Sequence, residues 1–549
     1  MRQNSVLHMV VVLFLVLVSM PLILPYIHSG YFLTHDGLWA VVRLGDMFRE
    51  LRDHQFPARY SGNLDFGYGY PLFNFAYPFP YYFGILFHLA KIPFVTTIKI
   101  LFGLTVPLSA VFMYFASCAL WKNKLGGVVS ALLYIYLPYR MVDLYVRGSI
   151  GESFAFVCFP LLVLAIRNIA FEKQKNLWIG IGGLAFAILI TSHNIMALLF
   201  LPVLLGIGIV CFVQNRQAFI PLLVSFFLGL FLAAFFWIPA LLEKNLILLS
   251  KISIANRSIN FVSLPQLLFS SWNYGNPGSQ NGFTYQIGFA QLFGFLLALV
   301  LAGKSFITKE KDVFRLLLAV FFIVLVFLMI SMLFSWSNFL WQHMPLFSII
   351  DYPWTFLGPI GFVLSLLGGY AIGKHTEIMT AMLVLVVIFQ GIVVFSYAKP
   401  ETYIFQPDNW YLTNQATTTS SSEYTPVWVK QLPLQSPLQK VVVQEGSVTN
   451  HFWNSREIAF SLNLPKNESV KINTIYYPGW KFFVDATPVG ISYANPQGVM
   501  YIQVPRGQHV IKGVFRETPL RLSADIISLI GICIVIGLFF FSAMKQFQT

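Results

Sequence analysis

A short polar cluster follows the first hydrophobic segment of the chain. Residues 6–28 are almost purely apolar, and soon afterwards the sequence reads Thr34-His35-Asp36-Gly37. Ionisable side chains beside a bilayer are costly to place and tend to be functional. We expect Asp36 to act as a general base toward an acceptor hydroxyl, with the option of sharing a divalent metal with another carboxylate. A helix N-cap is the structural alternative, since Asp is a favoured cap. His35 stays open between metal ligand, partner of Asp36 and bystander.

A second charged cluster lies between two apolar segments, in residues 138–152. Arg140 and Arg147 are candidates for binding a phosphate, because the planar guanidinium fork makes paired hydrogen bonds to phosphate oxygens. Asp143 and Glu152 are candidates for positioning a metal or an acceptor. The alternative is that the four charges form salt bridges with one another, which would let the loop pack.

Aromatic residues and isolated polar groups supply the remaining candidates. The stretch Gly67-Tyr68-Gly69-Tyr70-Pro71-Leu72-Phe73-Asn74-Phe75 combines chain breakers with rigid aromatic contact area, and Tyr70 and Asn74 are candidates for substrate binding. An interfacial aromatic belt explains the same pattern. His193, in the turn Ser192-His193-Asn194, is predicted to be a polar turn residue, with a site role as the alternative.

The composition predicts the kind of scaffold that holds these groups. Of the 549 residues, 57% are hydrophobic and only 10% are charged, whereas soluble proteins carry about 25% charged residues. We therefore expect a polytopic membrane protein. The net charge of +13 is expected to report topology and contact with anionic lipid rather than nucleic acid.

Apolar runs long enough to span a bilayer recur along the chain. They are predicted at residues 6–28, 97–118, 125–140, 153–170, 177–192, 194–213, 218–241, 286–303, 314–334, 355–373, 378–397 and 523–543. The segment 77–90 is apolar but short. Residues 37–53 show amphipathic spacing, which predicts a helix on the membrane surface with Arg43, Asp46 and Glu50 toward water.

The distribution of basic residues indicates whether segment 77–90 spans the membrane. If it does not, basic residues such as Lys122, Arg167 and Arg216 gather on one side, as the positive-inside rule requires. We therefore expect twelve spans in the plasma membrane, with both termini cytoplasmic. Segment 77–90 then joins 37–53 as a juxtamembrane helix of the first outer loop, residues 29–96.

The expected domains are a transmembrane domain at 1–397, an extracytoplasmic β-rich domain at 398–522, and a final helix with a cytoplasmic tail at 523–549. Strands are predicted at 427–432, 440–444, 457–464, 470–476, 480–485, 499–504 and 509–515. The cytoplasmic loops are too short for a nucleotide-binding domain, and the chain has no P-loop or GxGxxG motif. A transferase of this build would take its donor from the lipid phase.

Several motifs resemble one family. They are T-H-D-G at 34–37, G-Y-G-Y-P-L-F-N-F at 67–75, Y-P-F-P-Y-Y at 77–82 and P-Y-R-M-V-D-L-Y-V-R-G-S-I-G-E at 138–152. They look like the bacterial and archaeal membrane proteins labelled "6-pyruvoyl-tetrahydropterin synthase-related". The motifs Y-Y-P-G-W-K-F-F-V-D at 476–485 and P-R-G-Q-H-V-I at 505–511 also resemble the YfhO-type membrane proteins. The label implies no pterin chemistry here.

The resemblance implies the GT-C superfamily of glycosyltransferases, which use polyprenyl-phosphate-linked sugars and carry a catalytic acid in the first outer loop. That position is Asp36 here, and Asp143 and Glu152 match a second acid of the superfamily. A divalent metal (Mg or Mn) is an option that the resemblance leaves open. One departure is that Thr355 follows Pro353-Trp354, where relatives carry Arg.

The expected function is transfer of a sugar from a polyprenyl-phosphate-linked donor to an extracytoplasmic acceptor, which could be a glycan, a polymer or a protein. Two alternatives remain. One is a transporter or flippase of lipid-linked glycans, although such carriers typically show inverted repeats and broken helices. The other is a non-catalytic membrane scaffold that presents the β-rich domain.

Overall fold

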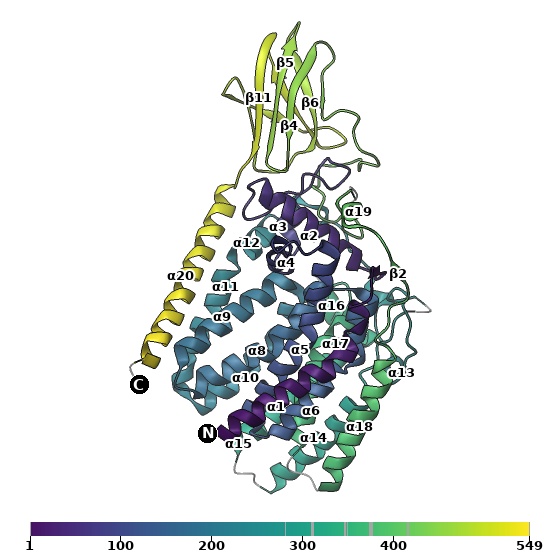
Figure 1. Cartoon of the computed structure of the whole chain (residues 1–549), viewed down its shortest axis with the longest axis vertical. Coiled ribbons are helices and arrows are strands. Elements are labelled where there is room, and N and C mark those ends of the chain that lie inside the picture. Colours follow the sequence, from purple (N-terminus) through teal and green to yellow (C-terminus); the bar gives the residue numbers. More distant parts are fainter. Residues whose placement is uncertain are drawn as a thin grey trace.

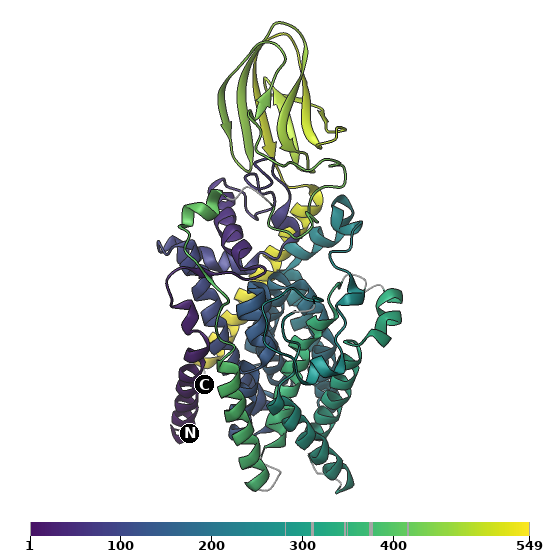
Figure 2. The same ribbon diagram turned by 90° about the vertical axis from the view of Figure 1, so that its right-hand side faces the viewer.

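The structure is a computed structural model, and it describes residues 2–279, 282–308, 312–344, 347, 350–372, 377–413 and 417–547. Parts of the expected outer loop 335–354, of the expected domain 398–522 and of the C-terminal tail lie outside these residues. A helical body carries a β domain at one end, and both chain ends lie at the opposite end of that body (Figures 1 and 2).

The helical body is built from membrane-length helices. Among the described residues, ten helices are long and apolar enough to span a bilayer. They involve α1 (Arg2–Ser19), α5 (Phe94–Trp121), α8 (Ile150–Phe171), α9 (Lys175–Ser192), α10 (Asn194–Gln214), α14 (Phe289–Ile307), α15 (Val313–Ser331), α17 (Leu357–Ala371), α18 (Glu377–Phe395) and α20 (Pro519–Phe547).

Two further spans are bent pairs of helices. Lys124–Ile135 (α6) continues into Pro138–Arg147 with a bend of 43°, and Arg216–Leu232 continues into Ala234–Leu242 (α12) with a bend of 70°. The second pair contains α11 (Phe219–Leu232). The described helices thus give ten to twelve candidate spans, and each predicted apolar run coincides with one of them. The predicted fold class, a polytopic helical protein with a small β domain, is confirmed.

Short helices fill the loop between the first two spans. They are α2 (Gly37–Arg52), α3 (Leu72–Phe75) and α4 (Phe79–Leu89). At 11 residues, α4 is about 16 Å long, too short for a hydrocarbon core of about 30 Å. The expected surface position of α2 is wrong. Arg43, Asp46 and Glu50 are buried, because later segments of the chain cover the polar side of this helix.

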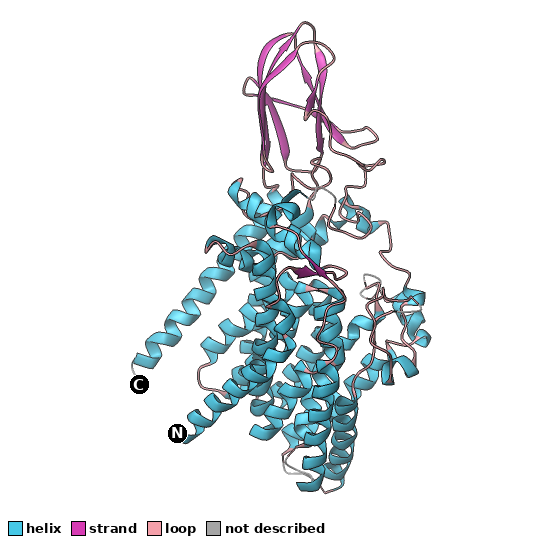
Figure 3. Ribbon diagram, turned by 45° about the vertical axis from the view of Figure 1, so that its right-hand side comes forward, coloured by secondary structure: helices cyan, strands magenta, loops and turns pink. Residues whose placement is uncertain are grey.

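The β domain consists of two antiparallel sheets that enclose an apolar core (Figure 3). The strand orders are β3-β6-β10-β9 and β4-β5-β11-β7-β8. The strands are β3 (Val441–Val442), β4 (Ser447–Trp453), β5 (Glu457–Leu464), β6 (Glu468–Ile475), β7 (Trp480–Val484), β8 (Thr487–Val489), β9 (Ile491–Ser492), β10 (Val499–Val504) and β11 (Gly507–Phe515). Phe460 and Leu462 alternate with less buried residues along β5. No strand forms at 427–432, so that prediction is wrong.

A two-residue strand joins distant parts of the chain next to the polar cluster. Tyr31–Phe32 (β1) pairs antiparallel with Tyr403–Ile404 (β2), which follows α18. The short helix α19 (Asp408–Thr413) then packs against α2. The segment that leads to the β domain therefore passes directly beside residues 34–37.

Candidate functional site

The two charged clusters found in the sequence meet through their backbones. The His35 N–H donates to the Val146 carbonyl (2.9 Å), and the Asp36 N–H donates to the Arg147 carbonyl (2.8 Å). Gly148 permits this approach, because it has a φ of +64° and a Cβ there would lie 2.2 Å from Thr34 Oγ1. The cluster at 34–37 and the cluster at 138–152 therefore form one site.

Asp36 stands at the start of α2 without capping it. The Thr34 hydroxyl, not the Asp36 carboxylate, accepts the Gly37 N–H (3.0 Å), and Asp36 makes no side-chain cap hydrogen bond. Asp36 is partly exposed, and within the described part of the chain its carboxylate has no hydrogen-bond partner. The N-cap alternative thus does not describe this turn, and the carboxylate is available to a ligand.

Two cations and one acid set the electrostatics of Asp36. Burial raises the pKa of this carboxyl group, while Arg147 and Arg43 are the main groups that oppose the rise. His35 opposes it as well, and Glu152 adds to it. The result is a carboxyl group that exchanges its proton closer to neutral pH than a solvated Asp, as suits a general base.

Arg147 is held in a defined orientation beside Asp36. Its Nη1 donates to the Tyr139 hydroxyl (3.1 Å) and pairs with Glu152. The guanidinium plane lies over the Trp354 ring, 4.8 Å from its centroid. Within the described ranges, no side chain or carbonyl accepts from Nε or Nη2 of Arg147. The side chain remains 12% exposed, so this cation can meet a ligand.

Arg140 and Asp143 lie behind this site, inside the helical body. Both are fully buried and form an ion pair (3.4 Å). Ser153 Oγ donates to Asp143 Oδ2 (2.7 Å), and Arg140 Nη2 donates to Thr105 Oγ1 (2.8 Å). Arg147 Nη1 also lies 3.9 Å from Asp143 Oδ1 and pairs with Glu152, so salt bridges join all four charges, as the structural alternative expects. Of these ion pairs, the Arg147–Glu152 pair borders Asp36. A phosphate role for Arg140 is therefore less supported than one for Arg147.

His193 also reaches the site. Its ring stacks on Tyr77 with 5.7 Å between centroids, and its Nδ1 accepts the Met196 N–H (3.2 Å) at the start of α10. Burial lowers the pKa of His193 to about 4; Glu152 opposes this shift, whereas Arg147 adds to it. His193 is therefore a neutral ring beside the Arg147–Glu152 pair. It serves as a helix cap, and it is close enough to contribute to the site.

The other sequence candidates have different surroundings. His35 Nε2 lies 3.1 Å from the Tyr274 carbonyl, so its ring contacts another loop. Tyr70 is buried, and its hydroxyl lies 3.3 Å from Thr418 Oγ1, the atom that also accepts from Arg43, so Tyr70 borders the site. Asn74 is also buried and donates to Glu243 Oε2 (2.7 Å), in a cluster that joins the helical body to the β domain.

Arg43 and Thr418 are among the residues of this site that the sequence interpretation missed. Arg43 donates from Nε to Thr418 Oγ1 (3.0 Å) and from Nη2 to the Thr418 carbonyl (2.5 Å). Arg43 also influences the pKa of Asp36. The amphipathic pattern placed Arg43 in water, and the Ser/Thr-rich tract at 417–422 carried no motif. The available signal in the sequence was that a cation, Arg43, follows Asp36 by seven residues.

The residues present give limited support for a metal ion. The described part of the chain contains no group of three or more His, Cys, Asp or Glu side chains that could hold one. Asp143 Oδ2 is engaged by Ser153 and Arg140, and Asp143 Oδ1 lies 3.9 Å from Arg147 Nη1, so two cations already neutralise the carboxylate that would share a metal with Asp36. A divalent metal at this site stays a prediction.

Comparisons with known proteins found distant structural likenesses. The chain is similar to the Archaeoglobus fulgidus oligosaccharyltransferase in its apo form, with 14% identity, a TM-score of 0.45, and coverage of 79% of this chain and 62% of that chain. It is also similar to the arabinofuranosyltransferase AftD from Mycobacteria, with 15% identity, a TM-score of 0.45, and coverage of 74% and 27% respectively.

A third similar structure is the archaeal oligosaccharyltransferase AglB from Archaeoglobus fulgidus in complex with an inhibitory peptide and a dolichol-phosphate. It has 15% identity and a TM-score of 0.43, and the match covers 80% of this chain and 62% of that chain. The chain thus spans less than two thirds of each of these proteins. No protein-family model and no curated protein matches the sequence.

Proposed function

We propose that the protein is a membrane glycosyltransferase of the GT-C type. It would transfer a sugar from a polyprenyl-phosphate-linked donor to an extracytoplasmic glycan, polymer or protein. One observation carries the proposal. The Asp36 carboxylate is partly exposed, has no hydrogen-bond partner among the described residues, and has Arg147 and Arg43 as the cations that most oppose the rise of its pKa.

The chemistry follows from those three side chains. The acceptor hydroxyl would attack the anomeric carbon of the donor sugar, and its proton would pass to Asp36. The bond between the anomeric carbon and the phosphate oxygen breaks, and the phosphate leaves with the electron pair. Arg147 would stabilise the negative charge that develops on the leaving phosphate, because its guanidinium is already oriented by Trp354 and Glu152.

The arrangement of the chain supports the proposed topology. The loop with α2 and the β domain lie at one end of the helical body, and both chain ends lie at the other (Figure 1). In the proposed orientation the termini are cytoplasmic, and Asp36 faces the outer side, where lipid-linked donors and envelope acceptors are found. The β domain would then stand above the site, on the side from which the acceptor approaches.

The test replaces Asp36 by Asn, which keeps the shape of the side chain and removes the base. Lipid-linked sugars and surface glycans are measured by mass spectrometry in cells with the wild-type gene, without it, and with Asp36→Asn. We expect the variant to match the strain without the gene while protein amount and thermal unfolding stay at wild-type values. Asp485→Asn, an exposed carboxylate of the β domain, is the control and should retain transfer.

The same experiment separates an enzyme from a carrier. A carrier of lipid-linked glycans needs no base, so it should tolerate Asp36→Asn better than Asp36→Lys. An enzyme should lose activity in both variants. Full transfer by a stable Asp36→Asn protein would contradict the proposed function.

A further inference from the structure

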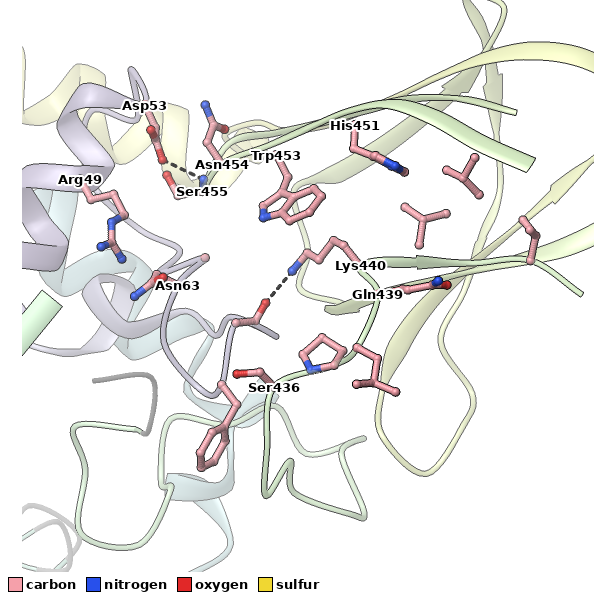
Figure 4. A pocket seen from close by; sticks show the side chains of 18 of the residues that line it. Arg49, Asp53, Asn63, Ser436, Gln439, Lys440, His451, Trp453, Asn454 and Ser455 are labelled. Carbon is pink, nitrogen blue, oxygen red and sulfur yellow. Dashed lines mark hydrogen bonds between the residues drawn. The ribbon is translucent and has the colours of Figure 1, made fainter. Parts of the chain in front are cut away.

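A large pocket lies between the first loop and the β domain, apart from the Asp36 site. Its volume is about 840 Å³, within the range of pockets that hold small organic ligands. One wall comes from the end of α2 and the turn after residue 60, including Arg49 and Asn63, and the other comes from β4 and the segment before β3. Figure 4 shows side chains from both walls directed into this space.

A half-exposed aromatic side chain lines the pocket. Trp453, at the end of β4, is 51% exposed although it is a large hydrophobic residue. His451, two residues earlier on the same strand, lines the pocket as well. The faces of aromatic rings are electron-rich, and the faces of sugar rings present polarised C–H groups. An open Trp is therefore suited to stacking against a sugar ring.

The other lining side chains are rich in amide groups. Asn63, Gln439 and Asn454 line the pocket, and an amide carries donors and an acceptor on one planar group. Asn454 Oδ1 already accepts the Arg456 and Glu457 N–H groups, and Asn63 Nδ2 makes one long contact with the Leu412 carbonyl (3.5 Å). Asp53 adds a carboxylate that already accepts the Ser455 N–H (2.8 Å). Vicinal hydroxyl groups of a sugar need such mixed pairs of donors and acceptors. The combination of an open aromatic ring and several amides matches a polar, largely uncharged ligand.

The two cations of the pocket do not make it an anion site. Lys440 Nζ donates to the Gly67 carbonyl (2.5 Å), and burial lowers the pKa of Lys440 to about 7. Arg49 Nη2 donates to the Leu412 carbonyl (3.3 Å), and its Nη1 lies 3.8 Å from Asp46. Both cations are thus already engaged, and Asp53 adds an opposing charge.

We infer that this pocket binds an oligosaccharide, with Trp453 stacking on one sugar ring and the amides of Asn63 and Gln439 bonding its hydroxyl groups. The pocket lies at the C-terminal end of α2, and Asp36 lies at its N-terminal end. The 16 residues of α2 separate the two by about 24 Å. A glycan of several sugar units can bridge this distance, so the pocket would hold the far part of an acceptor. That acceptor role rests on the proposed function, whereas sugar binding does not.

The test measures binding of defined sugars to the full-length protein in nanodiscs. The probes are hexasaccharides of α-1,4-glucose, β-1,4-glucose, α-1,6-mannose and galacturonic acid, with inorganic phosphate as competitor. We expect at least one neutral hexasaccharide to bind and phosphate not to displace it. Trp453→Ala should weaken binding about tenfold, the effect of losing one aromatic stacking contact, and Trp453→Phe should retain most of it.

Matched variants make the outcome decisive. Phe452→Ala removes an equally exposed ring (52%) from the neighbouring position of β4, outside the pocket, and should bind as wild type. Asp36→Asn should also bind as wild type, so a failed glycosyltransferase assignment remains distinguishable from a failed sugar site. No binding of any neutral probe, displacement by phosphate, or equal binding by Trp453→Ala would overturn the inference.

Discussion

At the scale of single residues, the site depends on which charges are paired. Arg140 and Asp143 form an ion pair inside the helical body, whereas the Asp36 carboxylate has no such partner among the described residues. The sequence showed all these charges but could not rank them, because burial and pairing depend on three-dimensional neighbours. What could be predicted was that each charged cluster stands beside apolar spans; the hydrogen bonds that join the two clusters appear only in the structure.

The role of Arg147 can be tested with a substitution that keeps its charge. Arg147→Lys retains a cation opposite Glu152 but loses the planar contact with Trp354 and the second pair of donors. Because such donors act on the charge of the transition state, we expect the transfer rate to fall about 10²- to 10³-fold. Arg506→Lys, on the exposed surface of the β domain, should leave the rate unchanged. A wild-type rate in Arg147→Lys would remove this residue from the mechanism.

At the scale of elements, α2 shows where sequence patterns mislead. Its spacing predicts one apolar and one wet face, yet Asp46 and Glu50 are buried. The pattern was real, but the polar face is covered by segments more than 300 residues away, including Thr418 and α19. In the β domain, too, the sequence pattern predicts only part of the structure. Strands with clean alternation, such as β5, were predicted, whereas the exposed edge strand β4 was not, because it buries no face.

The buried acids of α2 predict a particular dependence of stability on pH. Burial raises the pKa of Asp46 to about 6, above the unfolded value of about 3.9. The folded state therefore holds its proton more tightly, so the contribution of this group is fully present below pH 4 and is lost as the pH rises through 6. We expect Asp46→Asn to stabilise the protein at pH 7 by up to about 3 kcal/mol and to give no gain at pH 4.

Thermal unfolding of both proteins in detergent at pH 4 and pH 7 measures this effect. Wild type should lose more stability than Asp46→Asn between these two pH values. Equal melting temperatures for the two proteins at pH 7 would show that the Asp46 charge is well compensated in the folded state.

The turn at Gly148 offers a second prediction at the scale of elements. A Cβ at Gly148 would meet Thr34 Oγ1 at 2.2 Å and the Gly37 nitrogen at 2.9 Å, in a left-handed backbone conformation. We expect Gly148→Ala to push residues 34–37 away from Arg147, to reduce transfer strongly, and to cost about 1–3 kcal/mol of stability. Gly303→Ala, where a Cβ meets nothing within 4 Å, is the matched helical control. Unchanged transfer in Gly148→Ala would show that the close contact is not needed.

At the scale of the whole molecule, one buried cluster joins the two domains. Glu243 at the end of α12 accepts from Arg521 Nη2 (2.9 Å), Tyr477 Oη (3.0 Å) and Asn74 Nδ2 (2.7 Å). These partners come from α20, the β domain and the first loop. The sequence around Glu243 does not indicate this cluster, because its partners lie more than 150 residues away along the chain.

Breaking this cluster should loosen the β domain. Arg521→Met leaves the buried Glu243 charge unpaired, which costs about 3–5 kcal/mol, and we expect faster proteolysis within residues 417–518. The double variant Glu243→Met with Arg521→Met removes both charges and should lose less stability than the single variant. Thermal unfolding and limited proteolysis measure both effects. A single variant as resistant as wild type would show that the domains are held together elsewhere.

The short pairing of β1 with β2 has a consequence for biosynthesis. Tyr31 pairs with Ile404, so the strand that leads into Asp36 has no partner until most of the chain has left the ribosome. The same holds for Arg43, whose acceptor is Thr418. Spans inserted early therefore carry an unfinished site, and contacts this distant in sequence form slowly. The order of synthesis therefore delays assembly of the Asp36 site until residues 403–418 have been made, and a shorter nascent chain lacks the contacts that position Asp36 and Arg43.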